Sequence, residues 1–143
     1  MSSAPAPPLH QRGILDTSTL IRLPQIGGSI PLPAEPMITT VTLAELSVGP
    51  LVATDESERS ARQAHLQQAE SDFDPLPFDA KSARAFGRVA AALRRAGRKT
   101  TARSYDAMIA ATAIANELPL YTCNPSDFEG IEGLELVAVR PLP

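Results

Sequence analysis

Short apolar runs alternate with helix-like stretches along the chain. Four of these runs are predicted strands: Gly13–Asp16, Met37–Thr39, Leu120–Thr122 and Leu134–Val139. The first run ends in an acid, and the last shows the alternation of a strand with one buried face. Because short apolar strands separated by helices are typical of parallel sheets, we expect an α/β fold with helices on both faces of the sheet.

Five helices are predicted from apolar spacing and from the residues that begin and end them. Asp79 is a suitable cap for one helix, which ends at Gly97. This helix carries apolar residues at helical spacing on one face: Ala83, Phe86, Val89, Ala90 and Leu93. Ser104 can cap the next helix, which ends near Asn116. The other three are predicted over Thr17–Arg22, Thr42–Leu46 and Glu56–Ser71.

The chain is predicted to consist of a tail and one domain. Residues 1–12 include the small, proline-rich segment Ser2–Pro8 and are expected to form a flexible tail. Residues 13–143 are expected to form a single domain, which is long enough to bury a core. Within this domain, Pro24–Pro36 contains four prolines and two glycines and is expected to be mostly loop.

Composition narrows the class of protein. Apolar residues make up 43% of the chain but aromatic residues only 4%, so the core is expected to be aliphatic. The one cysteine, Cys123, excludes an intrachain disulfide. The chain starts without the apolar run of a signal peptide, and its most apolar window, Ala107–Ala115, is shorter than the ~20 residues that cross a bilayer. We therefore expect a soluble, cytoplasmic protein without a membrane partner.

Charge is unevenly distributed along the chain. The formal net charge is −3, yet eight of the thirteen Lys and Arg residues lie between Ala80 and Tyr105, where there is no acid. A polyanion meets the local field rather than the net charge. This basic stretch can therefore attract a polyanion, and a solvated helix face is the simpler alternative.

Four acids stand where predicted elements begin or end: Asp16, Glu45, Asp106 and Asp127. Each has an ordinary explanation. Asp16 can cap a helix, and Glu45 completes the capping-box pattern that begins at Thr42. Asp106 lies in the first turn of a helix, where the helix dipole favours an acid, and Asp127 lies among turn-forming residues.

Taken together, these four acids favour a divalent metal site. Mg²⁺ and Mn²⁺ prefer oxygen ligands, and clustered carboxylates repel one another without a cation. Asp16 and Asp127 both follow predicted strands, at the sheet edge where α/β proteins bind ligands. The chain has two isolated histidines and lacks the nucleophile-elbow, P-loop and dinucleotide motifs, so zinc binding, acyl transfer and nucleotide binding lack their usual signatures.

Four segments resemble the successive motifs of PIN-domain proteins, and especially of the VapC-type toxins of bacterial toxin–antitoxin pairs. They are ILDTSTLI from Ile14, TLAEL from Thr42, DAMIAATA from Asp106 and T-x-N-x-x-D-F from Thr122. The resemblance implies a PIN-like three-layer fold, with a mostly parallel central sheet of about five strands, and an endoribonuclease that depends on Mg²⁺ or Mn²⁺. It also implies an RNA substrate, a VapB-type antitoxin partner and a homodimer.

The resemblance also assigns roles to single residues. The catalytic acids are Asp16, Glu45, Asp106 and Asp127. The metal ligands among them are Asp16, Asp106 and Asp127. The polar positions that brace such a site are matched by Ser18, Thr122 and Asn124. We further predict that the basic stretch holds the RNA backbone through Arg94, Arg95, Arg98, Lys99 and Arg103.

Other classes of protein fit less of the sequence. A receiver-like signalling domain needs an adjacent acidic pair after one strand and a lysine after a late strand, and the only lysines are Lys81 and Lys99. A phosphate-transfer enzyme of the D-x-D type needs a second acid where Ser18 stands. A catalytically silent PIN module that only binds RNA or protein is the remaining alternative to a nuclease.

Overall fold

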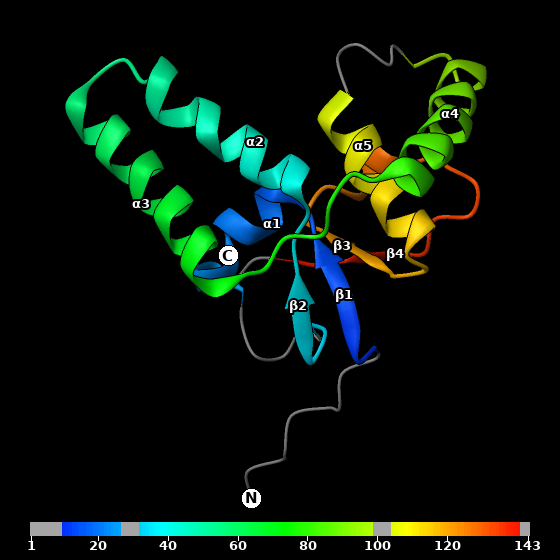
Figure 1. Cartoon of the computed structure of the whole chain (residues 1–143), viewed down its shortest axis with the longest axis horizontal. Helices are drawn as coiled ribbons and strands as arrows, with labels where there is room; N and C mark the ends of the chain where they lie inside the picture. The colour runs from blue at the N-terminus through cyan, green and yellow to red at the C-terminus, as the bar shows by residue number, and fades with distance from the viewer. Residues whose placement is uncertain (1–9, 27–31, 99–103, 141–143) are drawn as a thin grey trace, which may run out of the picture.

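The structure is a computed structural model that describes residues 10–26, 32–98 and 104–140. With η for a 3₁₀ helix, its elements in chain order are β1 (Arg12–Leu15), α1 (Thr17–Ile21), η1 (Leu23–Gln25), β2 (Glu35–Met37), α2 (Thr40–Val48), η2 (Gly49–Val52), α3 (Glu56–Asp72), α4 (Ala80–Arg95), α5 (Ser104–Ala115), β3 (Leu120–Thr122), η4 (Pro125–Phe128) and β4 (Leu136–Ala138) (Figure 1). The five predicted helices all occur. In the described part of the chain, no helix combines the length and apolar character needed to cross a bilayer.

Four strands form one sheet in the order β2-β1-β3-β4, and every pairing between them is parallel. The predicted parallel α/β fold is confirmed, although the described residues form four strands rather than about five. The second strand begins at Glu35, two residues before the predicted start at Met37. It also ends earlier than predicted, because Thr39 already serves as the cap of α2.

The strands that follow β1 in the sequence are added to the sheet on both sides of β1. β2 lies on one side of β1, whereas β3 and β4 lie on the other. In open parallel sheets, ligands bind at such a switch point, beyond the carboxyl ends of the strands. Asp16 directly follows β1, and Thr122 ends β3, so both residues stand at the switch point.

Alternate residues of the central strands pack on opposite faces of the sheet. Ile14 and Leu120 belong to a large apolar cluster with α4 and α5, whereas Leu15 and Tyr121 pack with side chains of α1 and η1. The layers and the aliphatic core are as predicted. Figure 1 shows α4 and α5 as one lobe and α2 and α3 as another, with the arrows of β1 and β2 pointing up between them.

The buried face of α4 is rotated from the predicted one. Its buried residues are Ser82, Ala85, Val89, Ala92 and Leu93. Ala83, predicted to lie in the core, is exposed. α4 packs mainly against α5, whose buried face is rich in alanine. Small side chains let the two helices approach closely, so Ala85 and Ala92 rather than Ala83 face the neighbouring helix.

The folded part of the chain starts before the predicted boundary. β1 begins at Arg12, and the carbonyl oxygens of His10 and Gln11 already accept hydrogen bonds from the backbone N–H groups of Ala34 and Glu35, at the start of β2. Residues 10–12, predicted to belong to the tail, are therefore part of the domain. The rest of the predicted tail, residues 1–9, lies outside the described residues.

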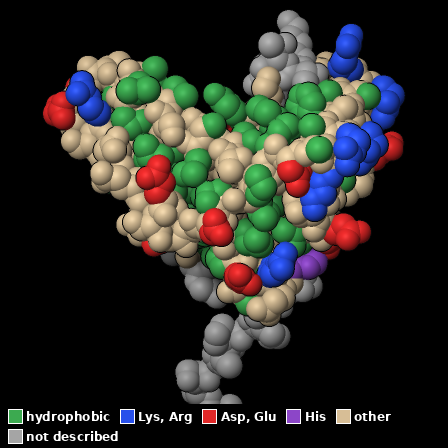
Figure 2. Space-filling view, in the orientation of Figure 1, with side chains coloured by type: hydrophobic (Ala, Val, Ile, Leu, Met, Phe, Trp, Pro, Cys, Tyr) green, Lys and Arg blue, Asp and Glu red, His purple; other side chains and the backbone are tan. Residues whose placement is uncertain are grey.

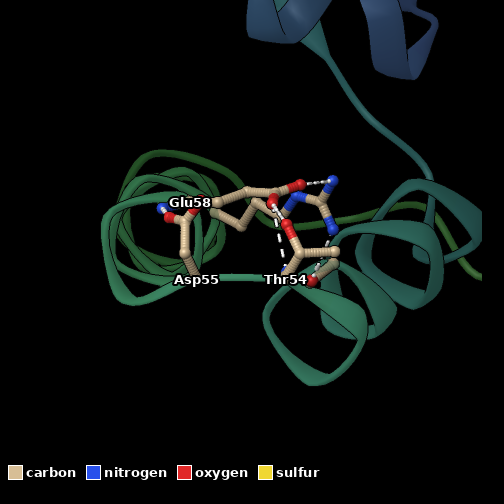
Figure 3. A network of polar contacts seen from close by, with 5 residues as sticks. Thr54, Asp55 and Glu58 are labelled. Atoms are coloured by element: carbon tan, nitrogen blue, oxygen red, sulfur yellow. Dashed lines mark hydrogen bonds and ion pairs between the residues drawn. The ribbon is translucent and has the colours of Figure 1, made fainter.

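A polar network fixes the corner between η2 and α3 (Figure 3). Asp55 caps α3 by accepting a hydrogen bond from the backbone N–H of Glu58 at 2.8 Å. Glu58 reaches back and accepts hydrogen bonds from the backbone N–H and the hydroxyl of Thr54, at 3.1 and 2.7 Å. Arg62 pairs with Glu58 and donates to the carbonyl oxygen of Gly49 at 2.9 Å. These contacts hold α3 against η2 at the end of α2.

Candidate active site

Asp16 uses its two carboxylate oxygens for two different contacts. Oδ1 accepts a hydrogen bond from the backbone N–H of Thr19 at 3.0 Å and so caps α1. Oδ2 accepts a hydrogen bond from the hydroxyl of Thr122, at the end of β3, at 2.6 Å. Since Asp16 is only 4% exposed, these bonds hold a buried carboxylate in one orientation. Asp16 is therefore a helix cap and also stands at the ligand-binding edge of the sheet.

Further hydrogen bonds join α1 to the end of β3 around Asp16. The backbone N–H of Asn124 donates to the Thr122 hydroxyl at 2.9 Å, and the Asn124 side-chain amide donates to the hydroxyl of Ser18 at 3.1 Å. The Ser18 hydroxyl lies 3.4 and 3.5 Å from the two carboxylate oxygens of Asp16. Ser18, Thr122 and Asn124 thus surround Asp16, while their role in bracing a metal site stays a prediction.

Glu45 does not take part in the capping box that its spacing from Thr42 suggests. The cap of α2 is Thr39, whose hydroxyl accepts a hydrogen bond from the backbone N–H of Thr42 at 3.3 Å. Glu45 lies inside the helix, and its carboxylate accepts a hydrogen bond from the hydroxyl of Thr17 at 2.7 Å. The Thr17 hydroxyl also lies 3.0 Å from that of Thr42. Glu45 is therefore linked to α1, the helix that Asp16 caps.

Asp16 and Glu45 are close enough for the charge of one to affect the other. Burial raises the pKa of Glu45 above its ordinary value; the hydrogen bond from Thr17 opposes this shift, and the negative charge of Asp16 adds to it. Among the described residues, no Lys or Arg forms an ion pair with either acid. Two neighbouring carboxylates with hydroxyl groups around them suit a hard divalent cation.

Asp106 and Asp127 come from two further elements. Asp106 lies in the first turn of α5 and Asp127 lies in η4, and both are partly buried. α5 packs against α2 and η4, and α1 packs against α2 and β3, so the elements that carry the four acids contact one another. Within the described ranges, however, no three Asp, Glu, His or Cys side chains lie close enough to hold one metal ion. The assignment of Asp106 and Asp127 as metal ligands stays a prediction.

The chain matches a known protein family over most of its length. The family model described as the PIN domain matches residues 14–133. The chain belongs to the PIN-domain family. The matched range includes all four segments that resemble PIN motifs, so the resemblance is confirmed.

Two curated relatives and one solved structure resemble this PIN domain over most of their length. Ribonuclease VapC5 of Mycobacterium tuberculosis is 35% identical over 97% of this chain and 98% of that protein. Ribonuclease VapC1 of Rickettsia felis is 30% identical over 88% of this chain and 95% of that protein. The crystal structure of VapBC-5 from Mycobacterium tuberculosis, a member of the VapBC family of toxin–antitoxin systems, contains a similar chain with a TM-score of 0.76 and 34% identity, covering 90% of this chain and 99% of that one.

The basic residues predicted to bind RNA have different environments in this PIN domain. Arg94 and Arg95 are exposed in the last turn of α4. Arg98 is engaged within the protein, because its guanidinium donates to a backbone carbonyl of η4 at 2.7 Å and pairs with the glutamate after η4 at 3.3 Å. Lys99 and Arg103 lie outside the described residues.

Two threonines that were not predicted from the sequence connect the elements of the site. Thr17 supplies the hydrogen bond to Glu45. Thr19 is fully buried, and its hydroxyl accepts a hydrogen bond from the backbone N–H of Cys123 at 3.0 Å, which ties α1 to the loop after β3. Their position in the first turn of a helix directly after Asp16 is the signal that points to both residues.

Glu45→Gln is expected to stabilise the metal-free PIN domain at neutral pH. Because the pKa of Glu45 in the folded protein lies above its ordinary value of 4.5, the folded state binds this proton more tightly than the unfolded chain does. The carboxylate therefore costs stability above the folded-state pKa, and the cost disappears as the pH falls below the ordinary value. The gain should be less than about 1 kcal/mol, since solvent screens a half-buried group. Thermal denaturation in EDTA, from about pH 4 to about pH 8, measures it.

Glu58→Gln is the matched control, with an expected effect of opposite sign. Hydrogen bonds from Thr54 lower the pKa of Glu58, so its charged form stabilises the folded state above the ordinary pKa. The variant should therefore have a lower Tm than wild type at neutral pH. If Glu45→Gln also lowers the Tm there, the proposed electrostatic cost at Glu45 is wrong.

Proposed function

We propose that this PIN domain is a metal-dependent endoribonuclease and the toxin of a VapBC-type toxin–antitoxin pair. The observation that carries the proposal is the buried Asp16 carboxylate at the switch point of the sheet, held by Thr122 and close to Glu45. The relative that is 35% identical over 97% of this chain is named a ribonuclease, which supports RNA as the substrate. The alternative is a catalytically silent PIN module that binds RNA or protein.

The side chains around Asp16 fit Mg²⁺ or Mn²⁺ by their chemistry. They offer carboxylate, hydroxyl and amide oxygens, which hard cations prefer. Mg²⁺ commonly takes one or two carboxylates directly and completes its shell with water and phosphate oxygens. Asp16, with either Asp106 or Asp127 as the second predicted ligand, would meet this need. Such an ion supplies positive charge at the phosphodiester and activates water for attack on phosphorus.

The residues of the chain have separate tasks in this proposal. The hydrogen bonds from Thr19 and Thr122 fix the direction of the Asp16 carboxylate, as a metal ligand requires. Glu45 has a raised pKa, which makes it a stronger base than an ordinary glutamate. Glu45 is therefore suited to accept a proton from the attacking water while Thr17 holds its carboxylate.

A VapB-type antitoxin is the proposed protein partner, and a homodimer is the proposed assembly of the toxin. The similar chain of VapBC-5 comes from a toxin–antitoxin system, and 99% of that chain is covered by the match. Inhibition by such a partner would keep a ribonuclease of this type inactive until the partner is lost.

The purified protein is expected to cleave single-stranded RNA in Mg²⁺ or Mn²⁺ and to lose this activity in EDTA. The same ions should raise the Tm, because a ligand that binds only the folded state stabilises it, by about 2.7 kcal/mol at one hundred times its Kd. Cleavage of a fluorescently labelled RNA and thermal denaturation, each with and without the ion, measure the two effects.

The two measurements separate the proposal from its alternative. A metal-induced rise in Tm without any RNA cleavage would favour the catalytically silent module. Cleavage that continues unchanged in EDTA would contradict metal dependence. Asp16→Asn serves as the control for the thermal shift, which should be much smaller in this variant because a predicted ligand is lost.

A further inference from the structure

One side of α4 carries a row of basic residues that lies outside the acidic site. The α4 basic stripe consists of Lys81, Arg84, Arg88 and Arg95. With 3.6 residues per turn, these four positions fall within an arc of about 60° around the helix axis. All four side chains are exposed, and α4 contains no Asp or Glu. Figure 2 shows Lys and Arg side chains gathered over α4 along the right-hand edge, with acidic side chains at their border.

The positive charge of the stripe is only partly balanced by nearby acids. Among the described residues, none of its four members forms an ion pair. Two acids lie close to its ends. Asp79, the cap of α4, is near enough to Lys81 for the lysine charge to lower its pKa, after the stronger effect of hydrogen bonds from Ser82. Glu132 lines the same groove as Arg88. The stripe therefore keeps a net positive charge.

None of the described residues that line the groove beside the stripe is aromatic. A groove of about 490 Å³ runs along it, and the α4 side chains between the arginines are small, as at Gly87 and Ala91. The aromatic residue of α4, Phe86, is partly buried and packs edge-to-face on Phe78, with ring centroids 6.3 Å apart. Single-strand binding normally relies on exposed aromatic rings that stack on bases, whereas duplex RNA is recognised through its backbone and shape.

The stripe is connected to the acidic site at one end. Arg98, just after α4, donates to the backbone carbonyl of Ser126 at 2.7 Å and pairs with Glu129, so the end of α4 is fixed to η4, which carries Asp127. From this end the stripe runs back along α4 over fourteen residues, or about 21 Å at 1.5 Å per residue. A nucleic-acid duplex presents on the order of one phosphate charge per 2 Å of its axis. A duplex arm of this length can therefore contact all four basic side chains.

We propose that the α4 basic stripe binds the phosphate backbone of a duplex arm in a structured RNA, whose single-stranded segment enters the acidic site. This inference rests on the proposed ribonuclease function and names the class of its substrate: an RNA with a helical arm beside the cleaved strand. The small side chains of α4 let the backbone come close, and the arginines contact phosphates without reading sequence. The arm thus adds affinity and orientation rather than a preference for particular bases.

The test compares two RNAs and two double variants. One RNA is a hairpin with a single-stranded extension, and the other is the extension alone. Arg84→Gln with Arg88→Gln removes two charges of the stripe, and Arg12→Gln with Arg59→Gln removes two exposed arginine charges outside α4. Binding is measured by fluorescence anisotropy at several salt concentrations in an Asp16→Asn background, in which the RNA stays intact. Cleavage of both RNAs is measured separately with Asp16 present.

The stripe variant is expected to bind the hairpin about 5- to 20-fold more weakly than wild type at low salt. This difference in affinity should become smaller as the salt concentration rises. The slope of log affinity against log salt concentration should become shallower by roughly 1.4 to 1.8 for two lost contacts. Binding and cleavage of the single-stranded extension should stay as in wild type, and the Arg12/Arg59 variant should resemble wild type with both RNAs.

Three results have different consequences. Hairpin binding equal to wild type in the stripe variant overturns the inference, whatever the cleavage assay shows. The inference is also wrong if the stripe variant loses self-association or binding to a protein partner while its hairpin binding is unchanged. The stripe is then a protein interface. Failure of the wild-type protein to cut either RNA in Mn²⁺ overturns the proposed ribonuclease function, while the anisotropy measurement still decides the role of the stripe.

Discussion

Asp16→Asn is expected to reduce metal-dependent RNA cleavage by about a thousandfold or more while the fold is kept. The substitution removes the charge of a predicted metal ligand, and metal ions contribute several kcal/mol of charge stabilisation to such reactions, at about 1.4 kcal/mol per tenfold in rate. The fold should survive because asparagine caps helices as well as aspartate does. The Thr122 hydroxyl, which now donates to Asp16, can accept a hydrogen bond from the new amide instead. Initial cleavage rates in Mn²⁺, with circular dichroism and Tm, measure both effects.

Asp55→Asn is the matched control for this loss. Asp55 caps α3 as Asp16 caps α1, with its carboxylate accepting a hydrogen bond from a backbone N–H at 2.8 Å. It stands at the corner between η2 and α3 (Figure 3), whereas the switch point lies at the ends of β1 and β3. The control should leave cleavage at the wild-type rate with a similar small change in Tm. Wild-type cleavage by a well-folded Asp16→Asn protein would show that Asp16 is not needed for catalysis.

Local sequence signals were sufficient for the elements that position the site. The strand Leu120–Thr122 has its predicted bounds, because a short apolar run stands between a helix end and turn-forming residues. The helix of α4 was also predicted, with Asp79 as its cap. The prediction of its buried face was wrong, because alanines on several sides of a helix give little periodic signal. Packing against α5 decides which of these alanines is buried, and that contact is not encoded in the local pattern.

In the site, too, the neighbouring sequence predicts where a residue stands but not which distant residue it contacts. Asp16 could be placed at the end of a strand because the apolar run before it is local. For Glu45 the spacing from Thr42 fits a capping box as well as a site acid, so spacing alone could not decide between the two. Its carboxylate instead meets Thr17, 28 positions away in the chain, and Asp16 meets Thr122, 106 positions away. Sequence spacing predicts where such residues stand, but only the packed fold determines which side chains meet.

Thr122→Val is expected to lower metal-dependent cleavage by roughly 10- to 100-fold, as loss of a residue that orients a metal ligand commonly does. The hydroxyl donates to Oδ2 of Asp16 at 2.6 Å and accepts from the backbone N–H of Asn124 at 2.9 Å. Valine keeps the shape but leaves a buried carboxylate oxygen and a backbone N–H without this partner, which costs about 1–3 kcal/mol of stability. Cleavage rate, metal affinity from the thermal shift, and Tm without metal measure the three effects.

Thr112→Val is the matched control, because Thr112 is equally buried and its hydroxyl donates to the backbone carbonyl of Met108 inside α5, at 2.8 Å. It should cleave RNA as wild type does. A double variant of Thr122→Val and Asp16→Asn decides how Thr122 acts. If the hydroxyl works by orienting the carboxylate, its removal should cost almost nothing further once that carboxylate is gone. If the two losses instead multiply, Thr122 acts on the RNA or the water directly, and the orienting role is wrong.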